Sequence, residues 1–287
     1  MEPACIAVSP DVSHSPILME AFVTSIAPLL ALVLAVPMPT LPTRDTGRAF
    51  DRYVAVAEAR IREQERSAGS FLDPIFDSRA RFDADLRQGG VAIAQVGATT
   101  TAIPGGLIHD WTGAVLIPDT TVAQALQIVQ DYNHLTRYYT PEVMDSRLIS
   151  RDGDNFHIFL RMREHKVITV VLDAEYDVTY GRLDASHQFS LSRSTRITEI
   201  ADAGEPHEHP LADVDNHGYL WRMNSYWRFV QIPDGVVVEC EAISLTRSIP
   251  EGLGWLIEPY LRDVPRDSLR SMLVETRDAV ESVAHGK

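Results

Sequence analysis

The chain is poor in cysteine and carries none of the common catalytic or nucleotide-binding signatures. It has only Cys5 and Cys240, with no C-x-x-C pair, which excludes a disulfide framework and a cysteine-based zinc site. The motifs G-x-S-x-G, H-E-x-x-H, the Walker loop and the dinucleotide fingerprint are also absent. We therefore predict no catalytic constellation, no cofactor and no metal site, and we interpret Cys240 as a small buried apolar residue.

Positive charge is scarce as well. The 26 Lys and Arg residues are outnumbered by 40 Asp and Glu residues, which gives a formal net charge of −14. Nucleic-acid binding needs a cationic surface, so we exclude nucleic acid as a partner. The same balance disfavours adsorption to anionic membranes. His207-Glu208-His209 is capable of binding a metal, but its spacing matches no structural zinc site, and we interpret it as part of an acidic loop.

Long apolar runs are limited to one segment near the N-terminus. Residues 26–36 are apolar but interrupted by Pro28, and they are too short to span a bilayer, so stable membrane insertion is not expected. The run matches the apolar core of an export signal, with a small-residue site at Val33-x-Ala35. We predict that residues 1–43 are an export signal and a proline-rich linker, which makes the protein periplasmic or secreted. A membrane anchor and a cytoplasmic leader remain alternatives.

The rest of the chain alternates between helix and strand patterns that fit one domain, residues 44–287. Helical periodicity covers 44–66, 122–130 and 265–284, the last beginning at Pro265. Strand patterns joined by tight turns cover 107–117, 143–151, 155–163, 167–180, 186–200, 218–232 and 236–245. Consecutive strands with short connections pair in antiparallel fashion, so the predicted fold class is α+β.

The last two strands form a predicted β-hairpin through Asp234-Gly235, a pair that tolerates the positive φ of a tight turn. A two-residue turn there sets Phe229 opposite Cys240 and Trp227 opposite Ala242. Alternation then separates an apolar face from a polar one. The polar face holds Arg222, Asn224, Tyr226, Arg228, Glu239 and Glu241, and we expect Arg228 and Glu241 to form an exposed cross-strand ion pair.

The apolar face and the terminal helix are the predicted ligand-binding surface. The simplest interpretation of such apolar stripes is a filled core. The alternative is a cavity wall around an apolar ligand, with Met side chains for adaptable contacts and hydroxyls to orient a polar end. The candidate residues are Trp221, Met223, Ser225, Trp227, Phe229, Cys240, Ala242, Met272, Leu273 and Thr276.

Particular stretches resemble the START/SRPBCC superfamily of helix-grip proteins. The helix-to-strand passage of the superfamily resembles residues 131–143. Its last hairpin and exit resemble Trp227-Arg-Phe, Pro-Asp-Gly235 and residues 241–250, and the start of its gripping helix resembles residues 265–273. The resemblance covers about residues 106–284. It implies a curved antiparallel sheet wrapped around a long C-terminal helix. The superfamily includes carriers, sensors and enzymes, so the resemblance indicates fold more strongly than function.

The resulting hypothesis is a carrier or sensor that binds a hydrophobic small molecule or lipid, and we consider a non-enzymatic role the better interpretation. The alternative is an enzyme similar to polyketide cyclases and aromatases. That alternative needs a titratable group inside the cavity, and the candidates are His109, Asp110, Arg228 and Glu241. A third interpretation is a structural or interaction protein with a filled core.

Overall fold

The computed structural model describes residues 41–72, 79–97, 100–165, 169–248 and 254–284. By internal compactness the chain divides after Pro37, and every described residue belongs to the second unit. The apolar run at 26–36 lies outside the described residues, so the export signal stays a prediction. Among the helices that the structure describes, none combines the length and the apolarity needed to cross a bilayer.

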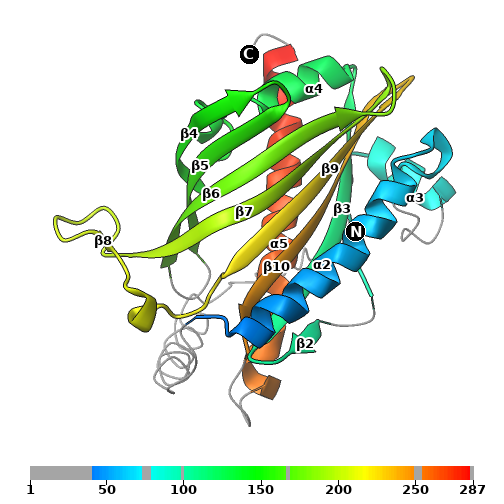
Figure 1. Cartoon of the computed structure of the whole chain (residues 1–287). Coiled ribbons are helices and arrows are strands. Elements are labelled where there is room, and N and C mark those ends of the chain that lie inside the picture. Colours follow the sequence, from blue (N-terminus) through cyan, green and yellow to red (C-terminus); the bar gives the residue numbers. More distant parts are fainter. Residues whose placement is uncertain (1–40, 73–78, 98–99, 166–168, 249–253, 285–287) are drawn as a thin grey trace, which may run out of the picture. The chain divides into compact units, whose positions relative to one another are not determined.

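One antiparallel sheet of ten strands organises the unit (Figure 1). Its main path runs β1-β3-β10-β9-β7-β6-β5-β4, while β2 pairs with β3 and β8 pairs with β7. The strands are β1 (Ala92–Gln95), β2 (Thr101–Ile103), β3 (Gly106–Pro118), β4 (Val143–Asp152), β5 (Asn155–His165), β6 (Thr169–Arg182), β7 (His187–Ala201), β8 (His209–Pro210), β9 (Arg222–Ile232) and β10 (Gly235–Arg247).

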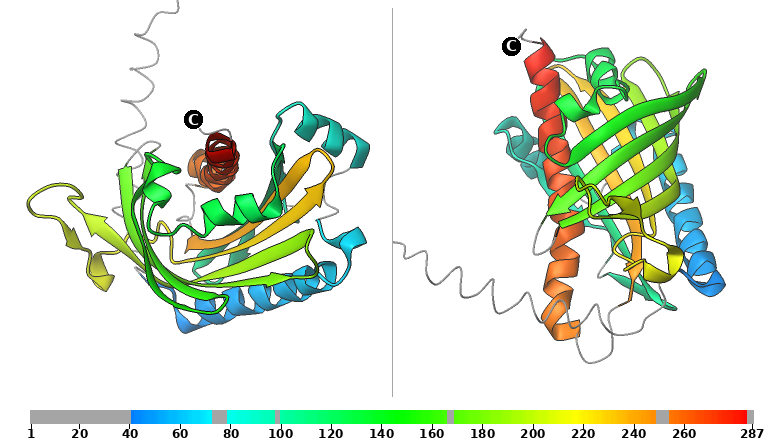
Figure 2. Two further views of the ribbon diagram at one scale, coloured as in Figure 1. Left: turned by 90° about the horizontal axis from the view of Figure 1, so that it is seen from above. Right: turned by 90° about the vertical axis from the view of Figure 1, so that its left-hand side faces the viewer.

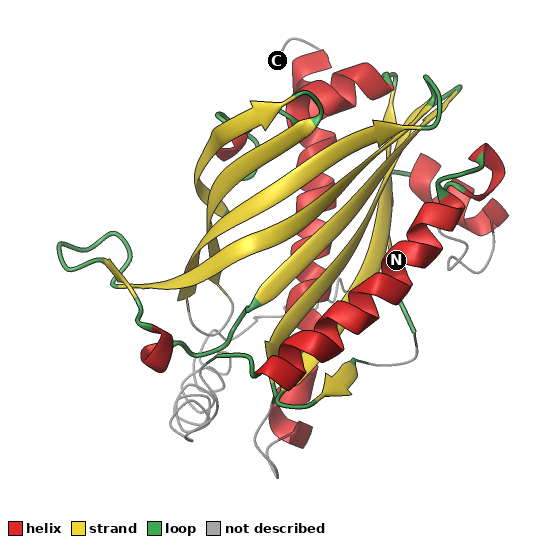
Figure 3. Ribbon diagram, in the orientation of Figure 1, coloured by secondary structure: helices red, strands yellow, loops and turns green. Residues whose placement is uncertain are grey.

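Helices lie on both faces of this sheet. The long C-terminal helix α5 (Gly254–Ala284) lies inside the curve of the sheet, and the N-terminal helix α2 (Arg44–Gln64) lies on the outer, convex face (Figure 2). Two shorter helices, α3 (Arg79–Arg87) and α4 (Val122–Val129), and single 3-10 turns complete the fold (Figure 3). The predicted α+β helix-grip fold is confirmed.

Local sequence explains where the first helices begin. The Thr43 side chain accepts a hydrogen bond from the Thr46 N–H and caps α2. Thr121 and Gln124 form a reciprocal capping box at the start of α4. Thr121 is the N-cap because its side chain accepts from the third helical N–H, that of Gln124.

The terminal helix starts earlier than its sequence indicates. We expected Pro265 to begin it, because proline is favoured at the first helical position. Instead α5 starts at Gly254 and continues through Pro259 and Pro265. Each proline removes one N–H from the helical ladder without ending the helix.

The β9–β10 hairpin differs from the expected register by two residues. Ile232 pairs with Gly235, so Pro233 and Asp234 are the central turn residues, and Trp227 lies opposite Cys240. Asp234 is not among the residues with positive φ, whereas Gly235 has φ 142°. Proline at the second and glycine at the fourth position suit an ordinary turn of this kind. A shift of two residues keeps every side chain on its predicted face.

The two faces of the central strands pack against different helices. On the concave face, Phe229, Val238 and Cys240 share a buried cluster with Leu269 and Leu273 of α5. On the convex face, Tyr226, Ile243 and Leu245 share another with Phe50 and Ile61 of α2. The pleat of the strands therefore decides which helix each residue contacts.

Gly113 lets α5 approach β3 closely. A Cβ built there would lie 2.7 Å from Leu273 Cδ1 and 3.1 Å from the Ala92 carbonyl oxygen, and it would also meet Ile93. Contacts this short are not tolerated, so a side chain at residue 113 requires the Leu273 and Ile93 side chains to move and the Ala92 carbonyl to shift slightly.

We predict that Gly113→Val lowers the free energy of unfolding by about 1–3 kcal/mol through overpacking. Urea unfolding measures this. The control is Gly47→Ala in α2, where an added Cβ meets nothing within 4 Å. That change should instead stabilise by about 0.5–1 kcal/mol, because alanine favours the helix. Equal effects of the two substitutions would contradict the close approach.

Candidate functional site

The concave face brings most of the predicted ligand-binding residues together. Trp227, Phe229, Cys240, Ala242, Met272 and Leu273 belong to or pack against one cluster beneath α5. The Trp227 and Phe229 rings stack with centroids 6.2 Å apart. Burial raises the pKa of Cys240, so it behaves as an apolar residue rather than a reactive thiol.

Met223 and Thr276 join this face to a second cluster formed by β5, β6 and the segment after α4. Met223 and Met272 both pack against the buried tyrosines there. The Thr276 hydroxyl lies 2.9 Å from Tyr139 Oη and donates to the Met272 carbonyl oxygen at 2.7 Å. Burial raises the pKa of Tyr139 to about 12. Sequence reasoning missed the role of Tyr139, although the aromatic-rich segment 132–139 was a visible signal.

Trp221 lies elsewhere. It precedes the first residue of β9, so strand alternation does not extend to it, and it packs in the cluster with α2. Its backbone N–H donates to the Leu245 carbonyl oxygen at 2.8 Å. The structure therefore separates Trp221 from the other nine candidate residues.

Along β9 the residues of the concave face are more accessible to solvent than the polar residues of the convex face. The concave-face residues Met223, Ser225 and Trp227 are only partly buried. Their convex-face neighbours Asn224 and Tyr226 are each 1% exposed, although they are polar. Both edges of β9 are paired, with β10 and β7, so solvent reaches Ser225 only from the side that α5 faces.

Small side chains are frequent in this part of the concave face. By the strand pairing, Ser192 lies beside Ser225, and Ser225 beside Ala242. Ser190 and Ser194 occupy the same face of β7, and Ser244 the same face of β10. Small residues leave room above a sheet, and their hydroxyls add polar groups to an otherwise apolar surface.

His109 is the one member of the expected titratable set that lies on the concave face. It is 1% exposed, and its Nε2 lies 3.1 Å from Thr246 Oγ1. Burial lowers its pKa to about 4, so the imidazole is neutral at pH 7. By alternation along β3, Asp110 lies on the opposite face, where the Tyr53 hydroxyl donates to its Oδ2 at 2.9 Å.

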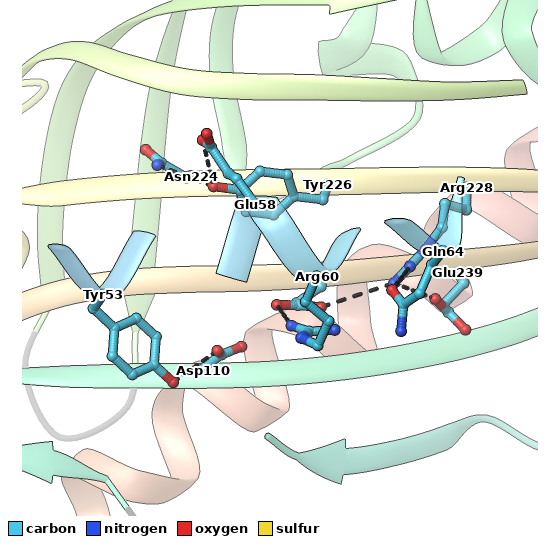
Figure 4. A network of polar contacts seen from close by, with 10 residues as sticks. Tyr53, Glu58, Arg60, Gln64, Asp110, Asn224, Tyr226, Arg228 and Glu239 are labelled. Carbon is cyan, nitrogen blue, oxygen red and sulfur yellow. Dashed lines mark hydrogen bonds and ion pairs between the residues drawn. The ribbon is translucent and has the colours of Figure 1, made fainter. Parts of the chain in front are cut away.

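Arg228 and Glu241 also lie on the convex face, and the expectation of an exposed pair was wrong. Arg228, Glu239 and Glu241 are all 0% exposed beneath α2 (Figure 4). Arg228 Nη2 lies 2.6 Å from Glu239 Oε1 and 3.8 Å from Glu241 Oε2. The sequence did not show that a helix would cover this face.

Helix α2 completes this buried network. Gln64 accepts from Arg228 Nη1 at 2.6 Å, and Arg60 donates to Glu241 Oε1 at 2.6 Å. Two guanidinium groups thus face two carboxylates. Nearer the start of α2, Glu58 accepts from two nitrogens of the Arg193 guanidinium, Nε at 2.8 Å and Nη2 at 2.7 Å. Burial opposes ionisation of Glu58, but the Arg193 hydrogen bonds hold its pKa below the usual range.

The remaining candidate features are a metal site, the acidic loop and two surface hollows. Among the described residues, no three His, Cys, Asp or Glu side chains are grouped to hold a metal ion. In the acidic loop, His209 Nδ1 lies 2.8 Å from the His207 carbonyl oxygen. His217 Nδ1 lies 2.8 Å from Glu199 Oε2. A surface hollow of about 240 Å³ adjoins Trp221 and Arg222 at the start of β9. Another of about 330 Å³ lies between α3, β3 and α5.

Comparison with known proteins assigns no function to this chain. No protein-family model matches the sequence, and no curated protein is similar to it. A structure from Thermus thermophilus has a TM-score of 0.44 at 12% identity, covering 60% of this chain and 97% of its own. The Zhui aromatase/cyclase from a Streptomyces species has a TM-score of 0.44 at 9% identity, and the match covers 61% of this chain and 94% of the cyclase. Human STARD10 has a TM-score of 0.42 at 10% identity, and the match covers 75% of this chain and 83% of STARD10.

The helix-grip arrangement of this chain is defined by its own strand order and terminal helix. Because each TM-score is below 0.5, no ligand, reaction or partner is inferred from these proteins.

We predict that Arg228→Met lowers the free energy of unfolding by about 3–5 kcal/mol, because it leaves buried carboxylates without their guanidinium partner. Urea unfolding measures the loss. The control is Arg66→Met, which removes an exposed pair with Glu63 and should cost less than about 1 kcal/mol. The double variant Arg228→Met with Glu239→Leu should recover part of the loss. A mild effect of Arg228→Met alone would contradict a dry interface.

We predict a pH-dependent contribution from Glu65, at the C-terminal end of α2. Burial raises its pKa to about 7, against the opposing charges of Arg228 and Arg62. Between about pH 4.5 and 7 the unfolded carboxyl is ionised while the folded one keeps its proton. Stability from this group is therefore complete at low pH and is lost as pH rises towards 7.

Subtracting the unfolding free energies of Glu65→Gln from those of the wild type isolates this term. The difference should fall by about 2 kcal/mol from pH 4.5 to 7 and then level off. Glu63→Gln on the exposed side of the same helix should give a flat difference, and a flat difference for Glu65→Gln would refute the shift.

Proposed function

We propose that this protein binds a hydrophobic small molecule or lipid between α5 and the concave face of the sheet. The observation that carries the proposal is the inverted burial of β9. Its concave face, with Met223, Ser225 and Trp227, is partly accessible, while its polar convex face is buried. In a filled core the apolar face would be the drier one.

The chemistry of the surface supports an apolar ligand with few polar contacts. Trp227 offers flat apolar area, and Met223 and Met272 adapt to irregular shapes. Removing the apolar surface of a ligand from water contributes about 25 cal/mol per Å² before the costs of association. The charged residues of the sheet centre face α2 and are engaged there, so they take no part in this binding.

An enzymatic role similar to that of a cyclase is the second candidate, and His109 is the observation that favours it. It is a titratable group on the concave face and is neutral at pH 7, as a general base must be. Asp110, Arg228 and Glu241 contact α2 and its neighbours instead, so one acid–base group supports the enzyme where four were considered.

Export into the periplasm or medium remains a prediction from residues 26–36 alone. A membrane anchor is its alternative.

We predict that Ser225→Phe weakens ligand binding, because its ring occupies the space above β9, whereas Ser225→Ala retains it. Native mass spectrometry of the purified full chain should show a co-purified small molecule. Titration with N-phenyl-1-naphthylamine, a neutral apolar dye, should give saturable fluorescence in the wild type and Ser225→Ala. Ser225→Phe should bind at least about tenfold more weakly.

A chain that shows a bare mass and no saturable dye binding would overturn the proposal. Comparable unfolding midpoints of the two Ser225 variants ensure that lost binding reflects lost space rather than lost structure.

A further inference from the structure

Two buried ring nitrogens on the concave face have no hydrogen-bond partner among the residues that the structure describes. They are His109 Nδ1 and Trp111 Nε1, and neither is reached by solvent. His109 is 1% exposed and Trp111 is 7% exposed. Leaving such groups unpaired is costly, and native proteins keep few of them. The residues lie two apart on β3 and therefore on the same face.

The two nitrogens border the accessible part of that face. In the strand register, Ser244 lies beside His109, and Ala242 lies beside Trp111. One strand further, Met223 lies beside Ser244, and Ser225 beside Ala242. Met223, Ser225 and Ala242 are all partly buried. A ligand above these three residues would therefore have the two unpaired nitrogens of the protein beside one of its ends.

The hydrogen-bond network sets the polarity of each nitrogen. The Arg247 carbonyl oxygen lies 3.4 Å from Thr246 Oγ1, and assigning the Thr246 hydroxyl as its donor leaves that oxygen to accept from His109 Nε2–H at 3.1 Å. A neutral imidazole that donates through Nε2 has an acceptor at Nδ1. The indole of Trp111 has only a donor, its Nε1–H.

We propose that His109 and Trp111 bind a hydroxyl group of the ligand, which deepens the proposed function and rests on it. The ligand O–H donates to His109 Nδ1, and the same oxygen accepts from Trp111 Nε1–H. A ketone can satisfy only the Trp111 donor. A carboxylate would bring an uncompensated charge to a dry site with a neutral imidazole. The ligand class is thus an uncharged apolar alcohol or phenol.

Displacement of bound N-phenyl-1-naphthylamine by three probes of equal chain length tests this specificity. We expect 1-decanol to displace the dye from the wild type at about tenfold lower concentration than 2-decanone, with decanoate weakest at pH 7. In His109→Leu the preference for decanol over decanone should vanish, while dye affinity stays within twofold. In Trp111→Phe both decanol and decanone should displace the dye more weakly.

The control is His134→Leu, which removes an exposed imidazole paired with Asp131 and should change no ratio. The unfolding midpoint of ligand-free His109→Leu should not fall far, because the substitution removes an unsatisfied buried nitrogen. The rise in unfolding midpoint that decanol causes in the wild type should be lost in His109→Leu.

The possible outcomes separate the two proposals. If the wild type does not bind the dye, the proposed function itself fails. If the dye binds but decanol and decanone displace it equally, or the preference survives in His109→Leu, the hydroxyl site is refuted while ligand binding stands. The wild-type ratio alone decides the matter if a variant does not fold.

Discussion

The period-two alternation of side chains along β3, β10 and β9 is the constraint on which the rest of this structure depends. These three neighbouring strands pair along most of their length, so a residue's place in the sequence decides which face it occupies. One face receives aromatic, aliphatic and small residues and meets α5. The other receives Arg228, Glu239 and Glu241 and meets α2. Both helices are therefore positioned by the same pleat.

The convex face shows how a buried charge network can be tolerated. Arg228, Glu239, Glu241 and Arg60 balance in charge, and Gln64 adds a neutral acceptor. Such a network contributes little net stability compared with an apolar interface, but it penalises any shift of α2 that separates the partners. Its consequence for function is indirect. It keeps the charged groups of the central strands away from the concave face, which leaves that face suited to an uncharged ligand.

The concave face combines three properties that rarely coincide in a simple core. Its central residues are partly accessible, its β7 and β10 positions carry small hydroxyl side chains, and two ring nitrogens beside it lack partners. A filled core would explain none of these, because interiors are close-packed and their polar groups are paired. Space, a few hydroxyls and a donor–acceptor pair are together the features expected of a small-molecule site.

The sequence by itself determined the antiparallel α+β class, the β9–β10 hairpin and the division of its residues between two faces, since these follow from local alternation and turn chemistry. It could not show that α2 covers the polar face, so Arg228 and Glu241 were expected in solvent. Nor could it show that Trp221 lies beyond the start of β9, or that the face shared by His109 and Trp111 borders an accessible surface. Those facts depend on which distant segments pack together, and only the tertiary structure decides that.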